Sequence, residues 1–111
     1  MESRLPAHLE IGGLIRAVDA AGGFATVNKK GGRDAGTFLV LCCENGTNGR
    51  LYERMPQPDG ERKWVLIRTQ DPENPHELSE YYTRRGKQDD DLWIVELDIK
   101  DGETFLYGNP A

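Results

Sequence analysis

The feature that most constrains the fold of this chain is the alternation of residues 92–99. From Trp93 to Ile99 every second residue is apolar, which is the spacing at which side chains of a β-strand lie on one face. The other face begins apolar and ends with Glu96 and Asp98. A strand of this kind does not suit an exposed edge. The pattern therefore predicts an inner strand whose first face lies on the core.

The residues that follow this strand predict a hairpin. Asp101-Gly102 suits a type I′ turn, since both positions tolerate a positive φ. Thr104–Tyr107 comes directly after the turn and contains three large apolar or aromatic side chains. We therefore expect Thr104–Tyr107 to return as a partner strand.

The rest of the chain predicts two helices and four more strands. An apolar stripe at helical spacing indicates a helix over residues 7–21. A second helix is expected to begin with Asn74 as N-cap and Pro75 in the first turn, and Glu77 completes a capping-box pattern. Gly86 is expected to end this helix. Strands are predicted over residues 24–30, 37–44, 50–55 and 63–68. The predicted fold is α+β: a single small domain over residues 1–111, with a mostly antiparallel sheet of five to six strands and two helices in the order αββββαββ.

Two adjacent glycines, Gly12-Gly13, interrupt the first helical pattern. Each lowers helix stability by about 1 kcal/mol relative to alanine. The helix is therefore expected either to begin after them or to pack closely against a neighbouring element at that point.

Charge and cysteine content narrow the functional classes. The net charge is −5, and residues 56–111 hold 13 acidic and 7 basic side chains. This acidic half lacks the basic footprint of a nucleic-acid surface. The chain also has no apolar run long enough for a membrane span and no secretory leader pattern, so a cytoplasmic protein is expected. The adjacent Cys42 and Cys43 should point to opposite faces of a strand, which excludes a disulfide between them.

Motifs for common catalytic and cofactor chemistry are missing. The sequence contains no phosphate-binding P-loop, no dinucleotide fingerprint and no serine-nucleophile elbow. His8 and His76 each stand without a cysteine or second histidine at metal-ligand spacing. The sequence therefore predicts no cofactor and no metal site, and favours a protein that is not an enzyme. Residues 89–91 are three consecutive aspartates, for which a solvated loop is the favoured interpretation and cation binding the alternative.

The strongest candidate site lies where the second helix meets the following strand. Arg84, Asp89, Asp91, Trp93 and Glu96 gather there in the sequence and could hold a protein partner or a small polar ligand. Structural ion pairs between the arginines that end the helix and these aspartates are the favoured alternative. Period two places Glu96 on the strand face opposite Trp93, which counts against one pocket shared by both.

A second candidate surrounds the glycine-rich turn of residues 31–36. Arg33, with Lys29 and Lys30, could help the backbone amides of this turn to bind an anion. An ordinary solvated hairpin tip is the favoured alternative. Asp34 belongs to the same turn and is included among the candidate binding residues.

Several of these segments resemble one known bacterial family. They are Asp89-x-Asp91-Leu92-Trp93-Ile94-Val95-Glu96-Leu97 preceded by Arg84, the turn Gly32-Arg33-Asp34-Ala35-Gly36, and Leu14-Ile15-Arg16 in the first helix. Together they are similar to the family known as domain of unknown function 1491, although Asp90 stands where that family usually has proline. The resemblance implies one small cytoplasmic domain and a link between the glycine turn and the Trp93 strand. It implies no activity.

These observations favour a non-catalytic binding or accessory domain that uses the junction between the second helix and the Trp93 strand. The alternative is a small carboxylate-dependent enzyme acting on a polar metabolite through Asp89 or Asp91 with Glu96. No nucleic acid or membrane is expected as a partner. A monomer or weak homodimer is expected.

Overall fold

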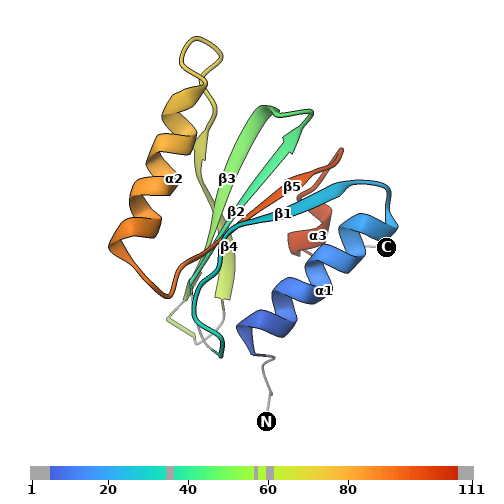
Figure 1. Cartoon of the computed structure of the whole chain (residues 1–111), viewed down its shortest axis with the longest axis vertical. Helices are drawn as coiled ribbons and strands as arrows, with labels where there is room; N and C mark the ends of the chain where they lie inside the picture. Colours follow the sequence, from blue (N-terminus) through green and yellow to red (C-terminus); the bar gives the residue numbers. More distant parts are fainter. Residues whose placement is uncertain (1–5, 35–36, 57, 60–61, 108–111) are drawn as a thin grey trace.

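The computed structural model describes residues 6–34, 37–56, 58–59 and 62–107. Its elements in chain order are α1 (Ala7–Ala20), β1 (Phe24–Lys29), β2 (Phe38–Glu44), β3 (Thr47–Pro56), β4 (Arg62–Thr69), α2 (His76–Gln88), β5 (Trp93–Asp98) and α3 (Thr104–Tyr107). Figure 1 shows α1 and α2 on opposite sides of one sheet. This is an α+β fold, as the sequence predicts.

The sheet has five strands in the order β1-β5-β2-β3-β4. All neighbouring strands run antiparallel except β2 and β5, which are parallel. Strand β5 therefore lies between β1 and β2, and the prediction of an inner strand is confirmed. No helix in the described part of the chain combines the length and apolar character needed to cross a membrane.

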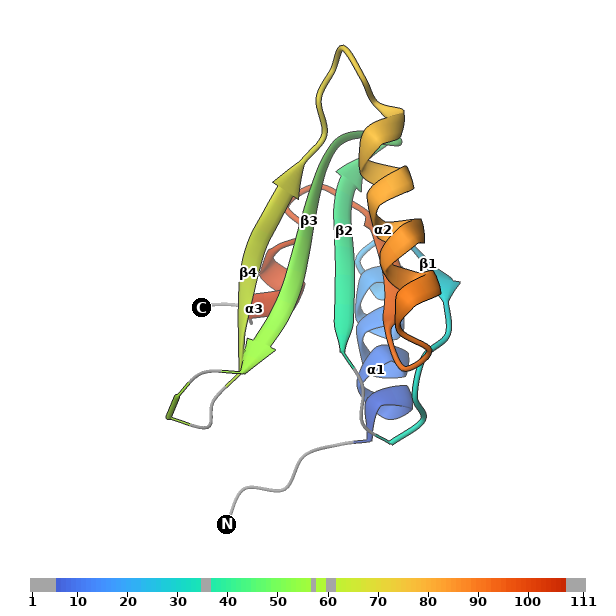
Figure 2. The same ribbon diagram turned by 90° about the vertical axis from the view of Figure 1, so that its left-hand side faces the viewer.

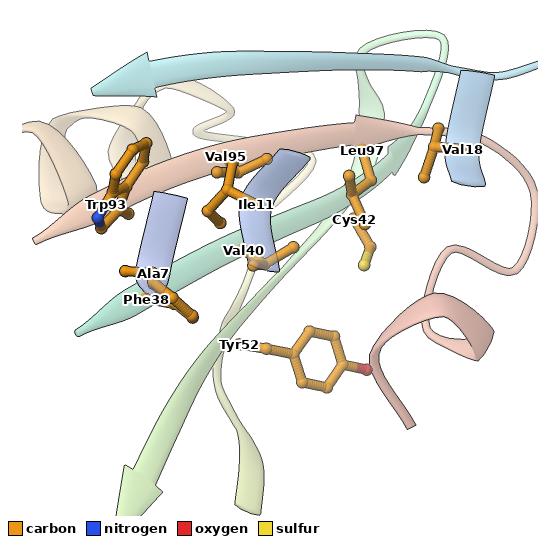
Figure 3. Packing of buried hydrophobic residues seen from close by; sticks show 10 residues of the cluster. All are labelled: Ala7, Ile11, Val18, Phe38, Val40, Cys42, Tyr52, Trp93, Val95 and Leu97. Carbon is orange, nitrogen blue, oxygen red and sulfur yellow. The ribbon is translucent and has the colours of Figure 1, made fainter. Parts of the chain in front are cut away.

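Each face of the sheet carries its own apolar core. On the α1 face, alternate residues of β5 from Trp93 to Leu97 pack with α1 and the even-numbered residues of β2 (Figure 3). On the α2 face, Leu92 and Ile94 pack with Leu78 of α2. Both faces of the central strands are thus covered (Figure 2), which explains why residues 38–43 are all buried.

Strand β3 is connected to the surrounding helices by three ion pairs. Arg54 pairs with Glu10 of α1 at 2.6 Å, and Glu53 pairs with Arg85 of α2 at 3.0 Å. Arg50 contacts Glu103, the residue before α3, at 2.7 Å. Alternation along β3 sends Glu53 to one face of the sheet and the two arginines to the other. These contacts join elements far apart in the sequence.

The predicted strand over Thr104–Tyr107 is wrong, because these residues form the short helix α3. Both hydrogen-bonding edges of β5 are occupied by β1 and β2, so a hairpin partner has no edge of β5 to join. Instead the carbonyl of Asp101, at φ 55°, accepts bonds from the backbone amide and hydroxyl of Thr104, each at 3.0 Å. The turn at residues 101–102 therefore leads into a helical turn.

The start of α2 and the role of Gly86 also differ from what the sequence predicts. Helix α2 has no side-chain cap and starts at His76 after Pro75, so the predicted capping box does not form. It also continues through Gly86 to Gln88. A Cβ on Gly86 would lie 2.8 Å from Lys29 Cδ, so this glycine permits close packing between the helix and β1 rather than ending the helix.

Helix α1 runs through Gly12-Gly13, and neither predicted explanation for these glycines holds. A Cβ on Gly12 would approach Arg16 Nη1 at 3.4 Å, and one on Gly13 would approach Arg16 Nη2 at 4.0 Å. The nearest neighbour is thus a flexible side chain of α1 itself. The helix tolerates the two glycines because its apolar face packs on the sheet.

Candidate functional site

Trp93 joins the start of β5 to the glycine turn and is not a surface residue. Its side chain is buried on the α1 face (Figure 3), and its indole Nε1 donates to the Gly32 carbonyl at 2.7 Å. The Gly32 amide donates in turn to the Asp91 carbonyl at 3.0 Å, and the Trp93 amide donates to Thr37 at 2.8 Å. These bonds confirm the link that the family resemblance implies, while residues 35–36 of the turn lie outside the described residues.

The aspartates before β5 form a local turn. Asp89 Oδ1 accepts from the Asp91 amide at 2.9 Å, and its carbonyl accepts from the Leu92 amide at 3.2 Å. Asp89 is half-buried, whereas Asp91 is exposed. The structure thus gives Asp89 a role in shaping the entry to β5.

The arginines that end α2 do not pair with these aspartates, so the predicted junction ion pairs are wrong. Arg85 instead forms two bonds to Glu53, each 3.0 Å long, and a third to the Tyr81 hydroxyl at 2.9 Å. Arg84 is exposed with its guanidinium 5.9 Å from the Tyr81 ring, and it has no ion pair within the described residues. Within the described residues Arg84 therefore forms no ion pair with the acidic residues of the predicted cluster.

Backbone carbonyls of the glycine turn accept hydrogen bonds from the start of α1. The carbonyls of Arg33 and Asp34 accept from the amides of His8 and Ala7, each at 3.1 Å, and Arg33 also accepts from His8 Nδ1 at 2.9 Å. These bonds satisfy amides that a helix N-terminus leaves without partners. The side chains of Arg33 and Asp34 are exposed.

The ammonium group of Lys29 bonds to backbone carbonyls of the loop before β5. Its Nζ donates to the carbonyls of Asp90 at 3.1 Å and Leu92 at 2.9 Å. The ammonium group is therefore occupied in holding the loop before β5.

A hollow lies on the other side of the sheet, under the first two turns of α2. Its volume is about 270 Å³. Its walls are apolar side chains of β2 and α2 with a few polar groups among them: Leu41, Cys43, Gly46, Gly49, Gln70, Pro75, His76, Leu78, Ser79, Tyr82 and Glu96. We call this space the α2 hollow. Glu96 is the one predicted candidate residue that lines it.

Glycine and glutamine set the shape of the α2 hollow at β3. A Cβ on Gly49 would lie 2.8 Å from Leu78 Cδ2, so glycine lets the helix approach the strand. The Gly49 amide donates to Gln70 Oε1 at 2.9 Å, and the Gln70 amide donates to the Gly49 carbonyl at 2.8 Å. This pair of bonds positions the chain that leads from β4 to α2.

Three possible metal ligands converge beside the α2 hollow. Single donor atoms of Cys43, Glu96 and Asp98 all lie within 4.8 Å of one another. The Cys43 thiol donates to Glu96 Oε2 at 3.7 Å. No other group of three such side chains is close enough to share an ion in the part of the chain that the structure describes.

The electrostatic environment of this cluster is negative. Burial, followed by Glu96 and Asp98, raises the pKa of the Cys43 thiol to about 11. Burial also raises the pKa of Tyr82, and Glu96 and Cys43 add to the effect. No ion pair neutralises either carboxylate within the described residues. A cationic group or ion is what this environment would stabilise.

Sequence reasoning identified Glu96 but missed Cys43, Asp98, His76 and Tyr82. Alternation along the strand does place Cys43 opposite Cys42, and it places Asp98 on the same face as Glu96. Alternation does not show that β2 pairs with β5, and this pairing is what brings Cys43 opposite Asp98. No local pattern encodes that parallel register.

Comparison with known proteins finds one family and several solved structures. The family model described as "Protein of unknown function (DUF1491)" matches residues 5–107. A crystal structure of a DUF1491 family protein from Caulobacter crescentus is 33% identical, with a TM-score of 0.79 over 92% of this chain and 94% of that one. A solution structure from A. tumefaciens is 31% identical, with a TM-score of 0.71 over 93% and 92% of the two chains. The search of curated proteins gave no match.

Proposed function

The chain belongs to the DUF1491 family, and for this member we propose a non-catalytic binding domain that takes a small polar ligand in the α2 hollow. The observation that carries the proposal is a concave space of about 270 Å³ with apolar walls and one carboxylate, Glu96, that no ion pair neutralises within the described residues. Ligand sites in proteins combine mostly apolar walls with a few polar groups that fix orientation.

The lining residues indicate the chemistry of the ligand. Glu96 favours a cationic or hydrogen-bond-donating group, and the thiol of Cys43 beside it adds no positive charge. Tyr82, Leu41 and Leu78 offer apolar surface to the rest of the molecule. The volume lies just below the range of about 300–1,000 Å³ that is usual for drug-sized ligands. We therefore favour a small amine-bearing metabolite over a nucleotide.

The test is an amide-shift titration by NMR of the labelled protein against pools of amines, amino acids and nucleotides. Binding should move the amides of Gly46, in the turn between β2 and β3, and of Ser79 and Tyr82 in α2, all of which line the hollow. Each pool that produces shifts is then resolved into single compounds, and their dissociation constants are measured.

Two charge-matched variants make the test specific. Glu96→Gln removes the carboxylate inside the hollow and should weaken an amine ligand at least about tenfold, because a bond to a charged group contributes about 1.5–3 kcal/mol. Glu77→Gln removes the same charge from the exposed face of α2 and should leave affinity unchanged. Saturable shifts confined to other surfaces, or none with any pool, would refute the proposal and favour a macromolecular partner.

A further inference from the structure

Cys43, Glu96 and Asp98 bring one sulfur and two carboxylate donors to within 4.8 Å of one another. We propose that these three side chains bind one divalent transition-metal ion, and that Zn²⁺ is the ion whose ligand preferences they fit. The proposal does not require that the α2 hollow take an organic ligand. Core packing does not explain why one thiol and two carboxylates meet at this place, whereas binding of a shared metal ion would.

The scaffold holds the three donors on rigid central strands. In the parallel ladder of β2 and β5, Cys43 is the direct partner of Asp98. Glu96 lies two residues before Asp98 and therefore on the same face. Adjacent strands lie about 4.8 Å apart, so the donors converge without a loop to position them. Sites on regular elements hold their geometry better than sites on loops.

The distances suit a tetrahedral zinc ion. Bond lengths of about 2.3 Å to sulfur and about 2.1 Å to oxygen place these two ligands about 3.6 Å apart in a tetrahedron. Cys43 Sγ and Glu96 Oε2 are 3.7 Å apart. Asp98 has a carboxylate oxygen within 4.8 Å of the Cys43 sulfur and of a Glu96 carboxylate oxygen, so the Asp98 side chain would have to move closer when an ion binds.

Each carboxylate is also oriented by a donor outside the cluster. Asn28 Nδ2 donates to Glu96 Oε1 at 3.3 Å, and the Asn45 amide donates to Asp98 Oδ1 at 2.8 Å. One oxygen of each carboxylate is thereby held, and Oε2 of Glu96 is the oxygen that faces the thiol. Hydrogen bonds of this kind orient the ligands in known metal sites.

The negative charge of the cluster and the softness of its sulfur donor indicate which metal ion it would bind. Two carboxylates beside a thiol that is 2% exposed repel one another, and a divalent ion would compensate them. Coordination would also deprotonate the thiol despite its raised pKa. A thiolate favours zinc over magnesium or calcium, which take oxygen ligands. Because Cys43 and Glu96 line the α2 hollow, a fourth coordination position would open into it.

Cobalt is the probe that reports on the thiolate directly. The reduced, chelator-treated protein is titrated with Co²⁺ in the absence of any organic ligand. We expect a sulfur-to-cobalt charge-transfer band in the near ultraviolet that saturates at one ion per chain and is removed by Zn²⁺. Because no organic ligand is present, failure of this experiment leaves the amine-binding proposal intact. The amine titration is done with a metal chelator present, so that its outcome does not depend on a bound metal ion.

The neighbouring cysteines supply a matched pair of variants. Cys43→Ala should abolish the band, whereas Cys42→Ala removes a thiol on the opposite face and should retain it. Asp98→Asn, with its isosteric side chain, should weaken Co²⁺ at least tenfold, and it tests the site independently if Cys43→Ala does not fold. A titration that never saturates, a band that survives Cys43→Ala, or an unchanged affinity in Asp98→Asn would overturn the proposal.

Discussion

Glu103 is the residue whose replacement should most clearly expose the electrostatic contribution to stability. Its carboxylate accepts from Arg50 Nε at 2.7 Å, from Arg50 Nη2 at 2.9 Å and from the Tyr52 hydroxyl at 2.9 Å. These bonds fasten the start of α3 to β3. The side chain is 25% exposed, so water screens the contact only in part. Glu103→Gln keeps the shape of the side chain and removes its charge.

The magnitude follows from the pKa of the carboxyl. Hydrogen bonds from Arg50, together with the bond from Tyr52, lower the pKa of Glu103 from 4.5 to about 2. Each tenfold change in the ionisation constant is worth about 1.4 kcal/mol, which sets an upper limit of about 3 kcal/mol at neutral pH. Partial exposure and the acceptor oxygen that glutamine retains reduce this limit. We expect Glu103→Gln to lower the free energy of unfolding by about 2 kcal/mol, or roughly 8 °C in Tm.

The effect should depend on pH with a definite sign. A carboxyl with a lower pKa in the folded state stabilises the fold above the unfolded pKa of 4.5 and loses that contribution as the pH falls towards 2. The difference between wild type and Glu103→Gln should therefore be constant from pH 7 to about pH 6. By pH 3 it should fall to less than about half.

Urea unfolding followed by tryptophan fluorescence at several pH values measures this difference. Glu73→Gln is the control, since Glu73 is exposed and forms no side-chain bond within the described residues. A loss below about 0.5 kcal/mol, or a loss that stays the same from pH 7 to pH 3, would refute the reasoning.

Three further predictions concern glycines and thiols. Gly13→Ala should stabilise the protein by about 0.5–1 kcal/mol in the same urea assay, because its Cβ finds ordinary contact space in a helix interior. Gly86→Ala should destabilise it by about 1–2 kcal/mol, because its Cβ would lie 2.8 Å from Lys29 Cδ; a gain in stability would contradict the packing described for α2. Burial raises the pKa of Cys43 to about 11 and that of Cys42 to about 12, so both thiols should react with a disulfide reagent at pH 8 at least about 100-fold more slowly in the native than in the unfolded protein. Rapid modification of the native protein would show that the strand opens readily.

Turns and the buried face of a strand can be predicted from the sequence, because their signals come from neighbouring residues. Asn-Gly is typical of a tight reversal between two strands, and the structure places Asn45 and Gly46 between β2 and β3 at positive φ, 52° and 76°. The alternating residues of β5 likewise revealed its buried face. In both cases the signal depends on backbone preferences of a few consecutive residues.

The candidate site was harder to predict because its members lie on elements that pair only in the folded chain. Alternation along the strand did place Trp93 and Glu96 on opposite faces, and the structure buries Trp93 on the α1 face while Glu96 lines the α2 hollow. Arg85 pairs with Glu53 of β3 rather than with the aspartates that follow it in the chain. Closeness in the sequence thus predicted the wrong ion pair for Arg85, because its partner comes from another strand.

The amino-acid sequence by itself determined the class of fold, the inner strand at residues 93–98 and the absence of a disulfide between adjacent cysteines. Only the tertiary structure decided that Thr104–Tyr107 is a helix and that Cys43 lies beside Asp98. The first set depends on periodicity and turn preferences, which act over a few residues. The second depends on which strands occupy the two edges of β5, and this is set by burial and hydrogen bonding across the whole sheet.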